Sequence, residues 1–316
     1  HLTFRDYEPK KVTAQSDLNR SKSETDTGPY RVENGCIGYM KMIGRGDDAF
    51  EKFTPLCNFS AWVAEELTKD DGVETDRVFL IEGNLDNGRV LPPAEVTAAR
   101  FSSMDWVVKN WGIQPRLASG QGAKDRLREA IQIFSQDVNE RTVYIHSGWR
   151  KIDGQWVFLH AGGAIGGEGV ETALEGSLSR YVLPDSVGDV QEAVKMSLQL
   201  LEVADYSITF PLLMSVTLAP LCEALRPDFS LWIYGTTGSM KSTLAALFLS
   251  HFGDFDWKSM PGSWESTGNA LEKQLFFAKD LLFGIDDYSP QPNPAAQSRL
   301  IQAIARVVRA QGNLTG

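Results

Sequence analysis

Residues 235–243 constrain the fold of this chain more than any other segment, because they lie between a short apolar run and a strong helix former. They read Gly-Thr-Thr-Gly-Ser-Met-Lys-Ser-Thr. The apolar run before them, residues 229–234, is bounded by a proline and a glycine, as a buried parallel strand would be. The residues after them, 244–250, favour a helix. This order predicts a strand, a glycine-rich turn and a helix start.

A helix start of this kind suits a polyphosphate, because its first backbone N–H groups are unpaired and carry the positive end of the helix dipole. Glycines at 235 and 238 let the chain approach phosphates closely. Lys241 is expected to reach the β- and γ-phosphates of ATP, and Ser242 to place its hydroxyl on Mg²⁺. The predicted nucleotide-binding loop comprises Gly235, Thr236, Thr237, Gly238, Ser239, Met240, Lys241, Ser242 and Thr243.

Met240 departs from the pattern G-x-x-x-x-G-K-[ST], which has glycine before the lysine. A methionine there needs a backbone angle that side chains rarely allow and room for its own side chain. Phosphate binding is therefore better supported than catalysis. The alternative is a Gly/Ser turn that precedes a helix by chance.

A second apolar run, residues 280–287, ends in two carboxylates. Asp286 is expected to hold Mg²⁺, directly or through water. Asp287 stands where many ATPases have a glutamate that orients the attacking water, and it is one methylene shorter. Lys241 and Asp287 are thus the predicted catalytic residues, and Ser242 and Asp286 are the predicted metal ligands. The alternative is a solvated Asp-Asp turn.

Composition narrows the class of protein. A chain of 316 residues with 42% hydrophobic residues can build two domains with real cores. A net charge of −10 argues against a protein that coats nucleic acid, but a local basic channel remains compatible with it. The isolated Cys36, Cys57 and Cys222 fit a reducing interior, which predicts a cytoplasmic location. The apolar residues 208–225 include two prolines and a glutamate, so they predict a buried helix and no membrane span.

The N-terminal half has two parts. Residues 1–28 are polar, lack apolar periodicity and predict a flexible tail. Residues 29–185 predict an α+β domain, with hairpin turns at residues 33–35, 86–88 and 153–154 and helices over residues 101–111 and 122–138. Trp149 beside Arg150 would suit base stacking, although a strand end with an inward-facing tryptophan explains the same residues.

Residues 186–316 predict an α/β P-loop NTPase core of the RecA/AAA+ type, incomplete at the C-terminus. An amphipathic helix is expected from residue 190 to residue 201, and another over residues 295–311. Arginines of the second helix could face a neighbouring subunit, nucleic acid or simply water. The further strands of such a core, with a γ-phosphate sensor and an arginine finger, are expected beyond Gly316.

Six segments carry a resemblance to a known family. They are Pro55-Leu-Cys-Asn58, His146-Ser-Gly-Trp-Arg150, His160-Ala-Gly-Gly-Ala-Ile-Gly166, Gly235-Thr-Thr-Gly-Ser-Met-Lys-Ser242, Ser263-Trp-Glu-Ser-Thr-Gly-Asn-Ala-Leu-Glu272 and Asp286-Asp287. The chain thereby resembles the family catalogued as domain of unknown function 927, found in helicase- or primase-related proteins. Some members belong to mobile genetic elements, and some are similar to minichromosome-maintenance-type replicative helicases. The resemblance implies an ATPase that acts on nucleic acid as a homo-oligomeric ring.

Two functions follow from the residues and the resemblance together. The first is a Mg²⁺-ATP-dependent motor on single-stranded or duplex DNA, helicase-like, in a replication or mobile-element system. The second is a nucleotide-gated module for nucleic-acid binding or assembly, with little or no hydrolysis. Met240, Asp287 and the acidic net charge favour the second. A response of hydrolysis to nucleic acid distinguishes the two.

Overall fold

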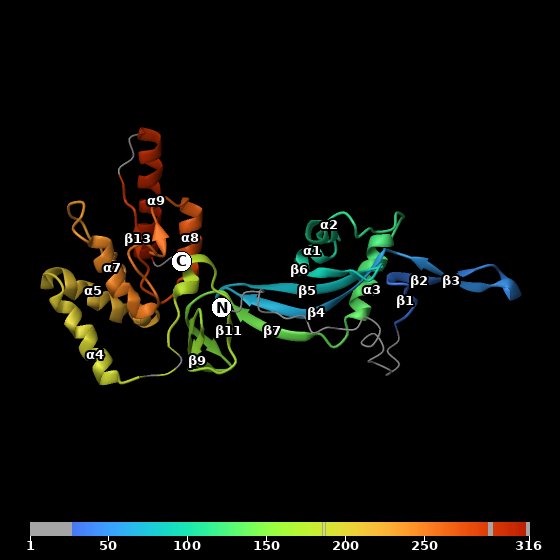
Figure 1. The fold of residues 1–316 in the computed structure, drawn as a ribbon, viewed down its shortest axis with the longest axis horizontal. Coiled ribbons are helices and arrows are strands. Elements are labelled where there is room, and N and C mark those ends of the chain that lie inside the picture. The colour runs from blue at the N-terminus through green and yellow to red at the C-terminus, as the bar shows by residue number, and fades with distance from the viewer. Residues whose placement is uncertain (1–26, 185, 187, 290–292, 314–316) are drawn as a thin grey trace. The chain divides into compact units, whose positions relative to one another are not determined.

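The structure is a computed structural model that describes residues 27–184, 186, 188–289 and 293–313. The chain forms two compact units (Figure 1). Of the described residues, unit 1 contains those up to Lys69 together with Thr75–Thr142, and unit 2 contains Asp70–Glu74 and those from Val143 onward. Residues 1–26 of the predicted flexible tail lie outside the described residues.

Unit 1 is built on two sheets. The strands β1 (Tyr30–Glu33), β2 (Cys36–Ile43) and β3 (Phe50–Pro55) form an antiparallel sheet in that order. The strands β4 (Phe59–Asp70), β5 (Thr75–Leu85), β6 (Val90–Thr97) and β7 (Asn139–Tyr144) form the other, in the order β7-β4-β5-β6. The helices are α1 (Ala98–Phe101), α2 (Trp106–Trp111) and α3 (Ala123–Phe134). Unit 1 thus combines strands and helices, and the α+β domain predicted over residues 29–185 stays a prediction.

The three predicted hairpin turns are also confirmed. Asn34 and Gly35 join β1 to β2 with φ angles of 51° and 76°, and residues 86–88 join β5 to β6. Asp153 and Gly154 join two later strands with φ angles of 48° and 85°. Two successive left-handed residues match the twist of a hairpin, which explains why Asn-Gly and Asp-Gly pairs predict these turns well.

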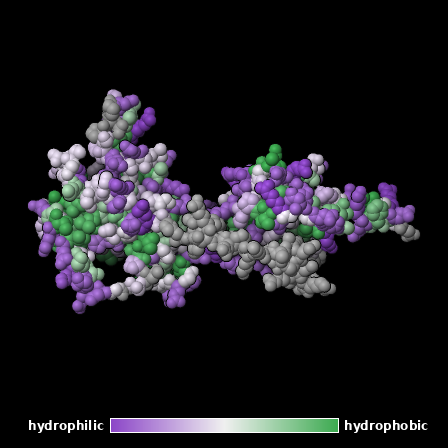
Figure 2. Space-filling model, viewed as in Figure 1, coloured by the Kyte–Doolittle hydropathy of each residue, from purple (hydrophilic) through white to green (hydrophobic). Residues whose placement is uncertain are grey.

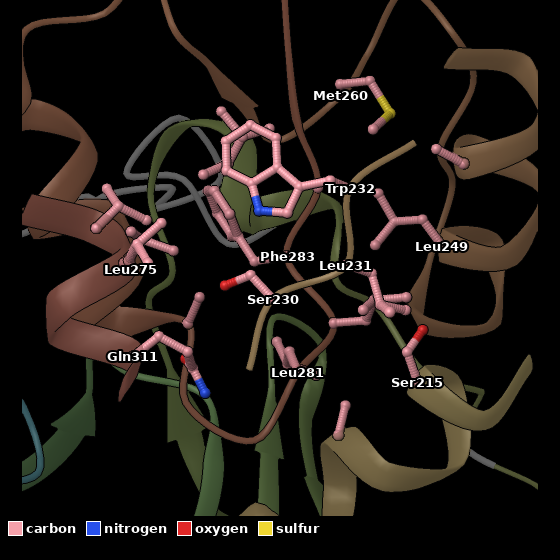
Figure 3. A pocket seen from close by; sticks show the side chains of 18 of the residues that line it. Ser215, Ser230, Leu231, Trp232, Leu249, Met260, Leu275, Leu281, Phe283 and Gln311 are labelled. Atoms are coloured by element: carbon pink, nitrogen blue, oxygen red, sulfur yellow. The ribbon is translucent and has the colours of Figure 1, made fainter. Parts of the chain in front are cut away.

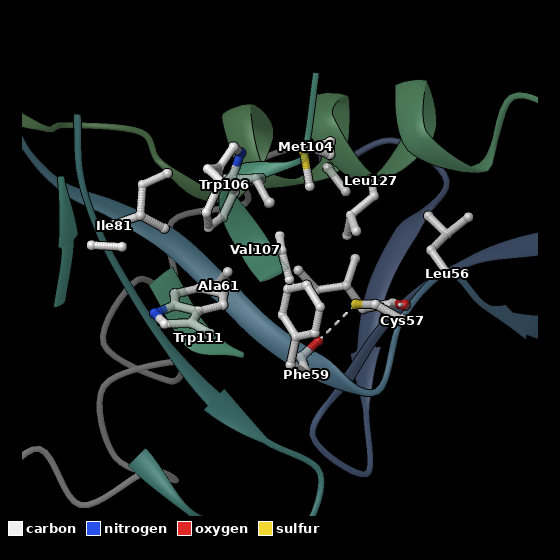
Figure 4. Packing of buried hydrophobic residues seen from close by; sticks show 14 of the residues in the cluster. Leu56, Cys57, Phe59, Ala61, Ile81, Met104, Trp106, Val107, Trp111 and Leu127 are labelled. Carbon is white, nitrogen blue, oxygen red and sulfur yellow. Dashed lines mark hydrogen bonds between the residues drawn. The ribbon is translucent and has the colours of Figure 1, made fainter. Parts of the chain in front are cut away.

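The helix predicted over residues 101–111 is interrupted. Met104 has a φ of 57° and separates α1 from α2. The break lets Met104 and Trp106 both enter the core of unit 1, where each is 2% exposed (Figure 4). Phe59 packs edge-on against Trp111 with 5.5 Å between ring centroids. Burial of aromatic area therefore decided the backbone here over helix propensity.

Cys57 is a structural residue of the same core. Its thiol donates a hydrogen bond to the carbonyl of Phe59 at 3.0 Å (Figure 4). Burial raises the pKa of the thiol to about 12. A thiol that stays protonated at neutral pH behaves as a small apolar side chain rather than as a nucleophile.

Unit 2 combines small sheets with longer helices. The strands β8 (Gly148–Ile152), β9 (Gln155–His160) and β10 (Gly163–Ile165) form an antiparallel sheet, β11 (Glu171–Thr172) pairs with the end of β7, and β12 (Gly262–Ser263) pairs in parallel with β13 (Ile285–Asp286). The helices are α4 (Val190–Gln199), α5 (Tyr206–Leu218), α6 (Cys222–Leu225), α7 (Lys241–Leu249), α8 (Gly268–Phe277) and α9 (Pro294–Asn313). The helix predicted over residues 295–311 is confirmed as α9.

The boundary between the compact units differs from the predicted domain boundary at residue 185. Phe158, Leu178 and Tyr181 pack in one cluster with Phe248 and Leu249 of α7. The hydroxyl of Tyr181 also donates to the carbonyl of Leu282 at 2.9 Å. Residues 143–185 therefore share their core with the C-terminal segment that contains the predicted loop.

The predicted buried helix over residues 208–225 is buried on one face only. Leu212, Leu213 and Val216 of α5 are buried, whereas Phe210 and Met214 are 40% exposed. Figure 2 shows hydrophobic side chains gathered over α5 at the left edge of the view. Among the described residues, Tyr206–Leu225 is the single helical stretch long and apolar enough to cross a membrane, judged by length and composition alone.

The strand predicted over residues 229–234 does not form. These residues belong to no sheet, and Trp232 and Tyr234 are 53% and 93% exposed. Of the strand predicted over residues 280–287, only Ile285–Asp286 pairs, with β12. A strand needs a hydrogen-bonded neighbour, and no described residue supplies one beside residues 229–234. The P-loop NTPase core stays a prediction.

His146 is a buried titratable residue of unit 2. Its ring is fully buried, its Nδ1 donates to the carbonyl of Ser147 at 2.7 Å, and its Nε2 has no partner among the described residues. Gly72 lies against the ring so closely that a Cβ there would be 3.2 Å from Nε2. A proton added to Nε2 would therefore have no acceptor.

Burial is the main cause that lowers the pKa of His146 below its ordinary value of 6.5. The positive charges of Lys279 and Arg150 lower it further, and the Ser147 hydrogen bond and Asp70 oppose the shift. The unfolded chain thus binds this proton at a higher pH than the folded chain does.

We expect the free energy of unfolding to keep the full contribution of neutral His146 above pH 6.5. Below pH 6.5 the free energy of unfolding should fall, at up to ~1.4 kcal/mol per pH unit for this one proton. His146→Gln should remove most of the fall, since an amide does not titrate. Urea unfolding of the parent protein and of His146→Gln between pH 7.5 and 5 checks this. An unchanged pH profile in His146→Gln would contradict the assignment.

Candidate phosphate-binding site

Residues 235–240 form a tight loop that leads directly into α7. The backbone N–H of Ser239 donates to the carbonyl of Thr236 at 3.3 Å, and its hydroxyl donates to the same oxygen at 2.8 Å. Gly238 has a φ of 85°, which explains the glycine at this position. The predicted helix start is confirmed, because α7 begins at Lys241.

Met240 adopts the left-handed conformation, with φ 58° and ψ 26°. The unusual backbone angle expected for this position is therefore confirmed. The side chain is 73% exposed, so it gains little from packing that could offset the strain. The room that the side chain needs is found in solvent rather than in the loop.

The start of α7 is open to an anion. Met240 precedes the helix and offers no side-chain cap to its first N–H groups. No acidic residue stands in the first turn. Ser242 is half-buried in that turn. Unpaired N–H groups and the helix dipole together attract a phosphate at such a position.

Lys241 is folded over the loop. Its ammonium donates to the carbonyls of Gly235 at 3.2 Å and Thr236 at 3.0 Å. These are neutral acceptors, which a phosphate oxygen would replace with a charge-assisted bond. The positive charge thus already lies at the mouth of the loop.

The acidic strand ends beside a serine. Ser263 of β12 lies opposite Asp286 of β13 in a parallel register. The hydroxyl of Ser263 donates to the Asp287 carboxylate at 3.4 Å. Asp286 is half-buried, and Asp287 is exposed with a φ of 62°. Ser263 falls in a segment that the resemblance singled out, but no sequence pattern assigns it this contact.

One large cavity collects the key predicted residues. It has a volume of about 1470 Å³, and Gly235, Thr237, Lys241, Ser242 and Asp286 are among its lining residues. Most of the remaining lining is apolar, including Trp232, Leu275, Leu281 and Phe283 (Figure 3). The structure therefore brings the predicted lysine, serine and one carboxylate to a single space.

The remaining predicted loop residues, which are Thr236, Gly238, Ser239, Met240 and Thr243, do not line this cavity, and neither does Asp287. They are all exposed to solvent.

The oxygen donors fit a hard cation. Ser242 supplies a hydroxyl and Asp286 a carboxylate, and Mg²⁺ is held in proteins by one or two such ligands together with phosphate oxygens and water. Within the described ranges, no three His, Cys, Asp or Glu side chains gather as a metal cluster. A Mg²⁺ site here would therefore need the nucleotide itself.

A second set of contacts holds the chain before the acidic strand. The hydroxyl of Ser147 donates to the carbonyls of Phe277 at 3.1 Å and Lys279 at 2.9 Å. The N–H of Trp149 donates to the Asp280 carboxylate at 2.9 Å. Burial raises the pKa of Asp280, and the bond from Trp149 opposes this shift. The resemblance named residues 146–150, and the structure gives them this anchoring contact.

Two predicted nucleic-acid contacts have structural partners instead. The indole N–H of Trp149 donates to the carbonyl of Pro220 at 2.7 Å, which confirms the inward-facing alternative. Arg306 of α9 forms an ion pair with Glu272 and bonds to Asn269 at 3.4 Å. Arg299 and Arg309 of α9 are exposed. Arg299 and Arg309 therefore remain candidates for the predicted basic face of this helix.

The model of a protein family described as a domain of unknown function (DUF927) matches residues 116–306. This range is more than half of the chain and contains every predicted site residue. No curated protein matches the chain.

Replacing Met240 with glycine tests the strain in the loop. A left-handed non-glycine residue costs about 1–2 kcal/mol, and glycine costs roughly 0.5–1 kcal/mol in unfolded-state entropy. We therefore expect Met240→Gly to stabilise the protein by ~0.5 kcal/mol. Met240→Ala keeps the strained Cβ and should bring no gain. Thermal unfolding compares the two, and an equal gain in both would assign the effect to the side chain instead.

Proposed function

The chain belongs to the DUF927 family, and we propose that it is a Mg²⁺-ATP-dependent nucleic-acid motor built on an α/β P-loop NTPase core. The observation that carries this proposal is the single cavity lined by Lys241, Ser242 and Asp286. An ammonium and a hydroxyl at a helix start, with a carboxylate that lines the same cavity, are the groups that a nucleoside triphosphate and its cation require.

The phosphates would bind at the start of α7. The open N–H groups of the first turn and the glycine-rich backbone would face the phosphate oxygens. Lys241 would exchange its two carbonyl acceptors for the β- and γ-phosphates. This exchange requires only rotation of the lysine side chain, since the ammonium already lies at the loop.

Mg²⁺ would be held by Ser242 and Asp286, and when bound it would neutralise charge on the transferred phosphoryl group. Asp287 would orient the attacking water, with Ser263 fixing the carboxylate through the bond at 3.4 Å. Because aspartate is shorter than glutamate, this role needs the water close to the end of β13.

DNA as partner and a homo-oligomeric ring are the parts of the proposal that rest on the family resemblance. The exposed Arg299 and Arg309 of α9 are compatible with a partner of negative charge. A cytoplasmic location is proposed with them. No membrane partner is proposed.

A nucleotide-gated module is the second candidate. Asp287 is exposed, does not line the cavity and already bonds to Ser263. A carboxylate in that position favours nucleotide binding over rapid turnover. In this case ATP would order the loop and the residues that line the cavity beside it, and hydrolysis would be slow or absent.

ATP turnover with and without single-stranded DNA distinguishes the two candidates, with Lys241→Ala as the blank. We expect DNA to stimulate turnover. Lys241→Ala should weaken Mg²⁺-ATP binding about 10- to 100-fold, because a charge-assisted phosphate contact is worth ~1.5–3 kcal/mol. Lys258→Ala, which removes a lysine outside the cavity lining, is the matched control. Binding without turnover in both conditions supports the module, and normal binding by Lys241→Ala refutes the loop assignment.

Asp287→Asn separates binding from catalysis. We expect nucleotide affinity within about threefold of the parent and turnover lowered about 100-fold or more, because an amide cannot accept a proton from water. Asp286→Asn should instead weaken the Mg²⁺ dependence of binding. Titration of a fluorescent ATP analogue and a phosphate-release assay measure the two quantities. Equal loss of affinity in both variants would give Asp287 a metal-holding role.

A further inference from the structure

The end of the β2–β3 hairpin extends away from the other elements of unit 1 (Figure 1). β1 pairs with β2 only as far as Tyr39, so the hairpin beyond that residue has two strands. Directly opposed residues of an antiparallel pair point to the same side. The opposed pairs on one side are Tyr39 with Thr54, Lys41 with Lys52, and Ile43 with Phe50. We name this side, which carries no acidic residue of the two strands, the hairpin face.

Two lysines lie directly opposite each other on the hairpin face. Lys41 and Lys52 are exposed, and neither forms an ion pair with another described residue. Like charges in this position destabilise a sheet, whereas a Lys–Glu pair would stabilise it. A single charge is enough to protect an exposed strand edge from aggregation. The second lysine is accounted for by an anion that lies along the face and converts the repulsion into attraction.

A third positive charge continues the row from α3. The guanidinium of Arg126 lies over the ring of Tyr39, 4.7 Å from its centroid, and its Nη1 donates to the Tyr39 hydroxyl at 3.2 Å. These contacts hold Arg126 beside the hairpin face and leave its charge in place. The Glu129 carboxylate on the same helix instead accepts a hydrogen bond from the Tyr30 hydroxyl at 2.6 Å. Because Tyr39 and Lys41 are two residues apart, the cations follow one another at about 7 Å along the strand.

The far end of the hairpin face is apolar. Phe50 is 57% exposed, and Ile43 opposite it is 37% exposed. The chain turns directly after Ile43 through Gly44 and Gly46, which have φ angles of 97° and 63°. An aromatic ring thus stands next to the lysine pair with half of its surface in solvent. Aromatic rings beside a row of cations are the groups on which single-stranded nucleic acids stack their bases.

We propose that the hairpin face binds a single-stranded nucleic acid, with a base stacked on Phe50 and the neighbouring phosphates on Lys41, Lys52 and Arg126. A single strand fits better than a duplex, because its unpaired bases can reach an aromatic ring. An acidic polypeptide would satisfy the lysines but would leave the ring without a partner. The site lies in unit 1 and needs no nucleotide. It goes beyond the proposed function, since it assigns a surface of its own to the nucleic acid.

Fluorescence anisotropy of labelled single strands tests the proposal. The strands are an oligothymidylate and an oligouridylate of about 12 nucleotides, whose affinities distinguish DNA from RNA, and an abasic strand of equal length. Poly-glutamate of similar charge is the competitor. The variants are Phe50→Ala and the double variant Lys41→Gln/Lys52→Gln. The matched control, Lys109→Gln/Lys195→Gln, removes the same two charges from exposed positions of α2 and α4.

We expect the Lys41→Gln/Lys52→Gln variant to bind about tenfold or more weakly at low salt. The slope of log affinity against log salt should fall by about 1.4, since each phosphate contact on a single strand contributes ~0.7. Phe50→Ala should bind about fivefold or more weakly with an unchanged slope, because it removes stacking and no charge. The matched control should stay within about twofold of the parent protein.

Thermal unfolding separates binding from structure. The Lys41→Gln/Lys52→Gln variant should be at least as stable as the parent protein, because the repulsion is removed. Equal affinity of the parent protein and both hairpin variants would overturn the proposal, and so would equal affinity for the abasic strand. Tighter binding of poly-glutamate than of either oligonucleotide would also overturn it and identify an acidic polypeptide as the partner. ATP is absent throughout, so failure of the proposed ATPase function leaves the result unaffected.

Discussion

The hydrogen bonds from residues 147–149 to the chain before β13 are the contacts on which the candidate site depends. Ser147 and Trp149 bind Phe277, Lys279 and Asp280, and so fix the point at which the acidic strand begins. Gly148 stands between them because a Cβ there would be 2.5 Å from the Asp280 carboxylate. The sequence His-Ser-Gly-Trp-Arg is thereby explained by anchoring rather than by base stacking.

Residues 229–234 lead directly into the loop at Gly235, which is the candidate phosphate-binding site. The backbone of these residues makes no hydrogen bond to another described residue, and the side chains of Phe229 and Trp232 are about half exposed. Trp232 nevertheless stacks on Trp264, with 6.0 Å between ring centroids. Side-chain packing, rather than a β-ladder, therefore holds the approach to the loop.

Short-range patterns predicted a large part of the structure. The Asn-Gly and Asp-Gly turns, α9 and the start of α7 at Lys241 depend on residues close in sequence, so their signals are local. The patterns missed β4, a strand of 12 residues, and the break at Met104. Pairing between distant strands and packing around Trp106 decide both, and neither leaves a periodic signal in one segment.

For the candidate site, the sequence by itself determined which groups are present: a glycine-rich turn, Lys241, Ser242 and two consecutive aspartates. The pattern, which has glycine at this position, also predicted the unusual backbone angle that Met240 adopts. Only the tertiary structure decided that Asp286 and Lys241 line the same cavity, while the carboxylate of Asp287 accepts a hydrogen bond from Ser263. It alone decided that the backbone of residues 229–234 has no hydrogen-bond partner among the described residues. Backbone pairing and the direction of a side chain depend on neighbours far away in sequence, and local residue types do not encode them.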